Sequence, residues 1–100
     1  MIDDALTPER TTDADGRAGD TELLRRYAKE RSEAVFAELV ARHVGLVYAA
    51  ALRQVGGAAH RAQDVVQTVF IELARQAPSL PARTEIVGWC HTKTHHAAAK

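Results

Sequence analysis

Residues 59–77 constrain the fold most strongly, because their apolar side chains recur at helical spacing. At about 100° per residue, the apolar positions of the segment AHRAQDVVQTVFIELARQA fall on one stripe. This stripe predicts an amphipathic helix with one face in a core, made by Ala62, Val66, Val69, Phe70, Leu73 and Ala77.

The opposite side of this predicted helix carries an aliphatic residue, Ile71, among polar ones. Asp64, Thr68 and Arg75 share its sector, and Gln67 lies at the edge. An apolar anchor inside a polar rim is typical of a helix that binds another protein. A solvated face with one exposed aliphatic residue is the alternative reading, because such residues are common on protein surfaces.

Two further helices are predicted before this one. Asp20 is a candidate N-cap for a short helix that begins TELLRRYAKE. Ser32 is the candidate cap of a long helix over residues 33–55, and the glycine pair 56–57 is expected to end it. Gly45 lies inside this long helix, where glycine costs about 1 kcal/mol relative to alanine. We therefore expect another helix to approach closely there.

The C-terminal part predicts a loop and one more helix. Pro78 and Pro81 frame a loop that is incompatible with continued helix, and Thr84 is the candidate cap of the segment EIVGWCHTKTHHAAAK. The inner side of this helix is expected to carry Ile86, Trp89, Cys90 and Ala97. No segment alternates with period two for long enough to predict a strand. The fold class expected for residues 20–100 is therefore all-α, a small bundle of about four helices.

Charge and composition describe the rest of the chain. The formal net charge is zero, but the first twenty residues hold six acids against two arginines. Residues 1–19 show no apolar period, so we expect a disordered acidic tail.

The single cysteine excludes an internal disulfide and fits a reducing cytoplasm. We find no secretory signal and no stretch apolar enough to span a membrane, so we expect a cytoplasmic protein without membrane contact.

Several segments, taken in order, resemble a known family. The block ELLRRYAKERSEAVFAELVARHVGLVYAAALRQVGG is followed by AQDVVQTVFIELAR, a proline-bearing loop and GWCHTKTHHAAAK. Together these are similar to region two of sigma-70 family RNA polymerase sigma factors, most of all to the extracytoplasmic-function type. The specific features are the long block and a D-x-x-Q-x-x-F core at Asp64, Gln67 and Phe70.

The resemblance implies that the outer face of the helix over residues 59–77 binds core RNA polymerase. In the family this face docks on a coiled coil of the β′ clamp. Carried onto this chain, the resemblance implies polar contacts from Asp64 and Gln67 and an apolar anchor at Ile71, with Thr68 and Arg75 as further candidates.

The resemblance also implies that the loop and the last helix bind promoter DNA. Family members recognise the minus-ten element and hold its non-template strand melted, which requires stacking and phosphate contacts but no cofactor and no catalysis. Trp89 matches a family tryptophan, for which we expect core packing before stacking. The candidate DNA-binding residues are Leu80, Arg83, Thr84, Trp89, Lys93, His95, His96 and Lys100.

The last helix departs from the family pattern, and a second family domain is absent. His95 stands where an arginine commonly follows the alanine, and Lys100 stands where an acid is common. No region-four helix-turn-helix domain is encoded, and the last helix runs to the end of the sequence, so we expect a truncated chain. The alternative function is a helical module that binds polymerase or an anti-sigma factor without initiating transcription.

Metal binding is a further alternative, and catalysis is the least supported one. His91 and His95 are four residues apart, with Cys90 and His96 nearby, but a metal site would need ligands from elsewhere, such as His43 or His60. No C-x-x-C or H-E-x-x-H motif is present. The acids are scattered and no glycine-rich phosphate loop occurs, so neither a resident metal nor an enzyme is expected.

Overall fold

The computed structural model describes residues 19–81 and 83–99. These residues form four α-helices and one short 3-10 turn, without a strand in the described ranges, and this confirms the all-α prediction. The predicted tail lies outside the described residues, apart from Gly19. The elements are α1 (Asp20–Glu30), α2 (Glu33–Gln54), α3 (Ala59–Gln76), η2 (Ala77–Ser79) and α4 (Ile86–Ala98).

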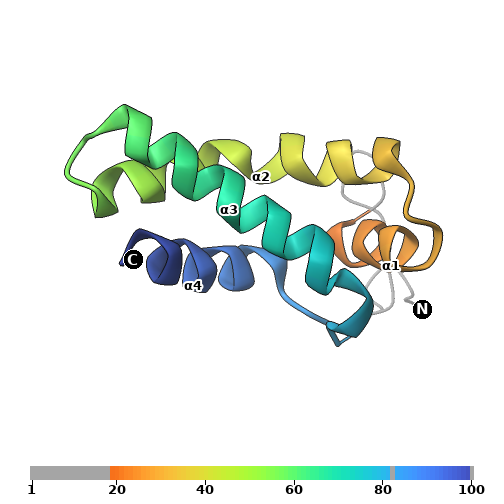
Figure 1. Ribbon diagram of the computed structural model, residues 1–100. Coiled ribbons are helices and arrows are strands. Elements are labelled where there is room, and N and C mark those ends of the chain that lie inside the picture. The colour runs from red at the N-terminus through yellow and green to blue at the C-terminus, as the bar shows by residue number, and fades with distance from the viewer. Residues whose placement is uncertain (1–18, 82, 100) are drawn as a thin grey trace, which may run out of the picture.

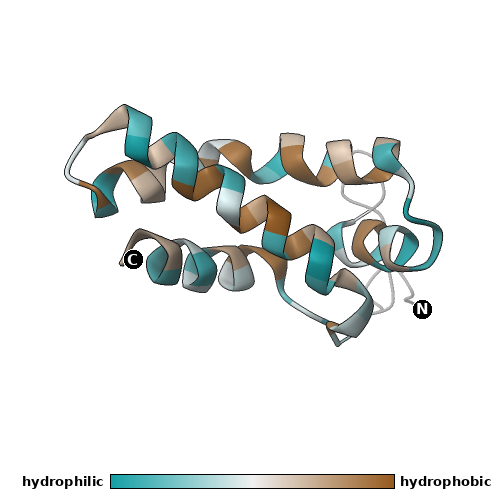
Figure 2. Ribbon diagram, viewed as in Figure 1, coloured by the Kyte–Doolittle hydropathy of each residue, from teal (hydrophilic) through white to brown (hydrophobic). Residues whose placement is uncertain are grey.

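Helix α2 is the centre of the bundle, because it contacts α1, α3 and α4. Figure 1 shows α3 crossing between α2 and α4, while α1 packs at the opposite end of the bundle from the C-terminus. Apolar and polar segments alternate along α3, as Figure 2 shows. The fully buried apolar side chains come from all four helices and include Leu23, Leu39, Val69, Leu73 and Ile86.

The predicted stripe of α3 is confirmed with one change. Ala62, Val69, Phe70 and Leu73 are buried, but the fifth buried residue of the helix is Val65 rather than Val66. Val66 is half-buried and packs against the edge of the core. Since the two valines are 100° apart on the helix, the core direction is slightly rotated from the one that the periodicity predicted.

The start of α1 differs from the prediction. Gly19, not Asp20, is the N-cap, and Asp20 is the first helical residue, so its carboxylate is free to reach α2. At the other end, Arg31 adopts a left-handed conformation with φ of 53° and ends the helix. Its guanidinium lies 4.3 Å from the centre of the Tyr27 ring, a cation–π contact that holds the turn against the core.

Helix α2 is capped as predicted, but Gly45 has a different role. The Ser32 hydroxyl accepts a hydrogen bond from the Val35 amide at 3.3 Å, and Gly56 and Gly57 take positive φ angles that end the helix. The expectation of a close helix at Gly45 is wrong: this glycine is exposed, and a Cβ there would meet nothing within 4 Å. The interior glycine therefore lowers helix propensity without a packing reason.

Helix α2 is also long and apolar enough to cross a membrane by length and composition, contrary to our reading of the sequence. In the bundle it contacts the three other helices, and its buried side chains are Leu39, His43, Val47 and Ala51. Helices at the centre of a small bundle pass the same length and hydropathy test. One of its large apolar side chains, Leu46, is 62% exposed.

Helix α4 starts one residue later than predicted. Glu85, not Thr84, is the N-cap, and its Oε1 accepts a hydrogen bond from the Gly88 amide at 2.7 Å. The inner side holds Ile86 and Cys90 as predicted, together with Thr94, which the sequence did not single out. The buried Thr94 hydroxyl donates to the Cys90 carbonyl at 2.6 Å, so its polar group is satisfied within the helix. Trp89 and Ala97 are half-buried at the edges.

Candidate functional site

The outer face of α3 is exposed along its whole predicted length. Ile71 has 58% of its surface exposed, and the side chains of Asp64 and Arg75 are about two-thirds exposed. Gln67 and Thr68 are also exposed. The structure thus brings the five residues predicted from the sequence together on one exposed, mixed apolar and polar strip, whose Thr68 and Arg75 border a groove shared with α4.

Three polar contacts on α3 were not predicted. The Glu72 carboxylate accepts hydrogen bonds from Arg75 and Gln76, each at 2.6 Å, and this Arg75 contact in particular lowers the pKa of Glu72. Arg75 is therefore oriented along its own helix. His60 lies 4.0 Å from Asp64, one turn earlier on the same face. The spacing is three residues for Glu72–Arg75 and four for the other two pairs, and these helical spacings are the signal that could have found the contacts.

The loop between α3 and α4 uses two of its three predicted site residues for folding. Leu80 is half-buried and packs against the core. The Thr84 hydroxyl donates to the Pro81 carbonyl at 2.7 Å and closes a turn. Arg83 is exposed, with no hydrogen bond or ion pair to another described residue. Of the loop residues assigned to DNA, only Arg83 presents its side chain fully to solvent.

Helix α4 places its predicted site residues on two sides. Trp89 is half-buried against the core, as the sequence favoured, and the Lys93 ammonium lies 5.6 Å from its ring centre. His95 and His96 are exposed, with ring centres 6.4 Å apart. Lys100 lies outside the described residues. The helix therefore presents imidazoles to solvent and holds its tryptophan inward.

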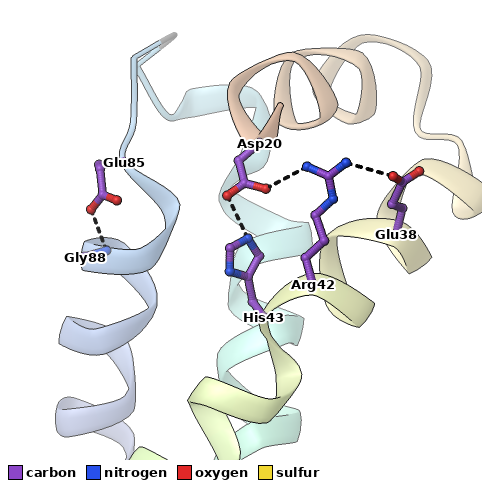
Figure 3. Close-up of polar contacts among 6 residues, drawn as sticks. All are labelled: Asp20, Glu38, Arg42, His43, Glu85 and Gly88. Carbon is purple, nitrogen blue, oxygen red and sulfur yellow. Dashed lines mark hydrogen bonds and ion pairs between the residues drawn. The ribbon is translucent and has the colours of Figure 1, made fainter. Parts of the chain in front are cut away.

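A polar network joins α1 to α2, as Figure 3 shows. Asp20 Oδ1 lies 3.3 Å from Arg42 Nη1, and Arg42 Nη2 lies 2.9 Å from Glu38 Oε2. Asp20 Oδ2 lies 2.9 Å from His43 Nε2. This last contact is short but does not form a hydrogen bond, so His43 Nε2 is buried without a hydrogen-bond partner among the described residues. Local sequence patterns do not predict this network, because 22 residues separate Asp20 from Arg42.

The buried Cys90 thiol is poorly suited to act as a nucleophile or as a metal ligand. Burial, reinforced by the carboxylates of Asp20 and Glu85, raises the pKa of the Cys90 thiol to about 11. The thiolate is the nucleophile and the metal ligand, so a pKa this high opposes both roles at neutral pH. Among the described residues, no three His, Cys, Asp or Glu side chains are grouped to hold a metal ion. His91 lines a groove beside Cys90, whereas His95 is exposed further along the helix.

Comparison with known proteins assigns the domain that carries these surfaces. Residues 39–100 match the family model of sigma-70 region 2, a match that begins within α2 and includes α3, the loop and α4. No curated protein and no solved structure matches the chain. The family consists of transcription-factor domains rather than enzymes, and it implies interaction with core RNA polymerase and promoter DNA. The match covers more than half of the residues of the chain, and the chain therefore belongs to the sigma-70 region 2 family.

Proposed function

We propose that this domain acts in transcription initiation as a sigma factor of the extracytoplasmic-function type, joining core RNA polymerase to the promoter minus-ten element in the cytoplasm. The observation that carries the proposal is the exposed strip on α3, in which Ile71 stands between Asp64 and Arg75. An exposed aliphatic side chain surrounded by polar ones suits a small interface with an apolar centre. In a member of this family, the β′ clamp is the partner that such a strip fits.

A pull-down with a purified β′ clamp fragment tests this assignment. We expect wild-type protein to capture the fragment and the Asp64→Ala/Gln67→Ala variant to lose most of the capture. Both side chains are exposed, so the substitutions remove polar contacts without disturbing the core. Adding Ile71→Ala to the double variant should weaken capture further, because a central apolar anchor typically contributes more than about 1 kcal/mol to binding.

A matched control replaces an acid and an amide that lie off the strip. Glu30 and Gln54 are exposed, at the ends of α1 and α2, so Glu30→Ala/Gln54→Ala should bind like the wild type. Equal capture by the two double variants would move the interface away from α3. Absence of capture by the wild type would refute polymerase binding by this domain.

The DNA side of the proposal rests on Arg83 and on the exposed part of α4. Arg83, His95 and His96 are the predicted DNA-binding residues that are open to solvent, and Lys93 is half-buried beside Trp89. Lysine and arginine contacts to phosphate position a strand, and aromatic stacking holds unpaired bases. We assign these residues to the non-template strand, and Leu80 and Thr84 to the support of the loop that carries Arg83.

The second candidate function is polymerase or anti-sigma binding without promoter opening. It is favoured by α4, on which the exposed basic residues are histidines rather than lysines or arginines. A permanganate footprint of promoter DNA with core polymerase separates the two functions. Reactive thymines in the minus-ten element support the sigma-factor role, whereas clamp capture without them supports the alternative.

A further inference from the structure

A groove of about 120 Å³ runs between α2 and α4, and its floor is apolar. Leu46, Val47 and Ala50 line it from α2, and Val87 and Cys90 line it from α4. Leu46 is 62% exposed and Val87 is 46% exposed, so two large aliphatic side chains border the groove in contact with water. Since a cavity of about 150 Å³ holds a benzene ring, a groove of this size fits an aliphatic side chain.

The polar side chains on this α2–α4 groove are basic or imidazole, apart from the buried Thr94. Arg53 and His91 are exposed, and Arg53 makes no hydrogen bond or ion pair with another described residue. The buried His43 lies at the end nearest to α1, with the Asp20 carboxylate beside it. The described lining holds no carboxylate of its own. The groove therefore fits an occupant that combines aliphatic and acidic side chains.

The N-terminal segment of the same chain has this composition. Residues 2–6 read IDDAL, with two acids between Ile2 and Leu6 and no basic side chain. Ile2 and Leu6 are four residues apart, which is the spacing that places two side chains on one face of a helical turn. Residues 1–18, which lie outside the described part of the chain, carry five acids against two arginines. The segment therefore matches the groove in its aliphatic and in its acidic character.

The attachment point of this segment lies at one end of the groove. Asp20 begins α1, and its carboxylate lies 2.9 Å from His43, as Figure 3 shows. From His43 to Arg53 the groove follows α2 for about 15 Å, at about 1.5 Å per residue. A flexible connection over residues 7–19 has a root-mean-square length of roughly 20 Å. Because this length matches the span, the effective concentration of residues 2–6 at the groove is on the order of 1 mM.

We infer that residues 2–6 dock into the α2–α4 groove of their own chain, with their two aliphatic side chains on its floor and their acids toward Arg53. The inference goes beyond the proposed function, because neither the strip on α3 nor Arg83 lines this groove. Docking covers Leu46 and Val87 and so keeps the groove from other apolar partners. Burial of two aliphatic side chains gives the free peptide a dissociation constant on the order of 1 mM, so the tethered segment occupies the groove about half of the time.

Methyl NMR of the full chain tests the docking. In the wild type, we expect nuclear Overhauser contacts from the methyl groups of Ile2 and Leu6 to those of Leu46 and Val87. The variant Ile2→Ser/Leu6→Ser should lose these contacts and shift the Leu46 and Val87 resonances. Addition of a peptide of residues 1–12 to this variant should move both resonances back toward and past their wild-type positions, because the wild-type groove is only about half occupied.

Two control variants separate docking from unspecific effects. Ala14→Ser/Ala18→Ser changes two apolar residues of the same tail outside residues 2–6, so it should keep the wild-type contacts. In the double-serine background, Arg53→Gln should weaken peptide binding about two- to fivefold, as expected for an exposed ion pair. Arg61→Gln should leave the affinity unchanged, because Arg61 is exposed on α3 and does not line the groove.

The outcomes distinguish three occupants of the groove. Identical Leu46 and Val87 methyl shifts in the wild type and in the double-serine variant would overturn the inference, and so would a peptide that does not bind at several times its expected dissociation constant. Contacts that arise only between a labelled and an unlabelled chain, and that grow with protein concentration, would overturn it in favour of a second copy. Clamp capture is measured separately, so none of these results decides the proposed function.

Discussion

The contact between α1 and α2 predicts a large loss of stability from one substitution, Asp20→Asn. The Asp20 carboxylate lies beside two largely buried side chains, Arg42 at 3.3 Å and His43 at 2.9 Å, which are only 14% and 7% exposed. A hydrogen bond or contact to a charged group contributes about 1.5–3 kcal/mol when its partner is left buried. Asp20 is itself 30% exposed, and Arg42 keeps its contact with Glu38, so the lower part of that range applies.

We expect Asp20→Asn to reduce the free energy of unfolding by about 2 kcal/mol, out of the roughly 4–12 kcal/mol typical of about 80 residues. For a domain of this size, that loss lowers Tm by about 8–16 °C. The change keeps the side-chain volume and removes only the charge. Loss of a negative charge in the first turn of α1 adds a few tenths of a kcal/mol through the helix dipole.

Urea and thermal unfolding followed by circular dichroism measure the effect, with Glu30→Gln as the control. Glu30 is an exposed acid on the same helix, so its substitution should change stability by less than about 0.5 kcal/mol. A double-mutant cycle with His43→Gln isolates the pair, and we expect a coupling energy of about 1 kcal/mol. A loss below about 0.5 kcal/mol for Asp20→Asn, or strict additivity in the cycle, would show that the network does not stabilise the bundle.

Three further predictions concern single side chains. Glu85→Ala removes the cap on the Gly88 amide and should cost about 0.5–1 kcal/mol of stability in urea unfolding, which an unchanged midpoint would contradict. Cys90 should react with a thiol reagent at about pH 8 only as fast as the domain opens, because the thiol is buried and its pKa is raised to about 11; immediate labelling would contradict this. Hydrogen bonds from Arg25, and then Arg26, lower the pKa of Glu22. The ionised Glu22 carboxylate therefore stabilises the fold at pH values above the pKa of a free glutamate. This stabilisation is lost as the pH falls through the lowered pKa of Glu22 in the folded protein. Glu22→Gln should therefore cost about 0.5 kcal/mol at neutral pH and almost nothing near pH 2, as unfolding at both values would show.

The predictable part of the fold is the part encoded by periodicity within one helix. The stripe of α3 and the exposed position of Ile71 follow from a pattern repeated over five turns, so an error at Val66 does not change which face is buried. Helix starts are less predictable, because one residue decides each of them. At both α1 and α4, the true N-cap lies next to a better capping candidate, Asp20 in one case and Thr84 in the other.

Contacts between distant segments could not be predicted, because no local pattern encodes them. Asp20 resembles a helix cap in the sequence. Only the packing of α1 on α2 shows that its carboxylate contacts Arg42 and His43. His43 is buried on α2, and the carboxylate beside it comes from a different helix. The position of Gly45 illustrates the same limit, since only the structure shows that no described helix packs over it.

The loop before α4 shows how folding restricts the residues left for recognition. Leu80 contributes to the core and Thr84 closes a turn, so using either one on a flipped base would first require breaking a contact that supports the loop. Arg83 is exposed and makes no such supporting contact with another described residue. Under the proposed function, strand contacts therefore fall to Arg83 and to the exposed residues of α4, His95 and His96. A domain arranged in this way would bind polymerase through the exposed strip on α3 and bind DNA through side chains that the fold does not use for its own packing.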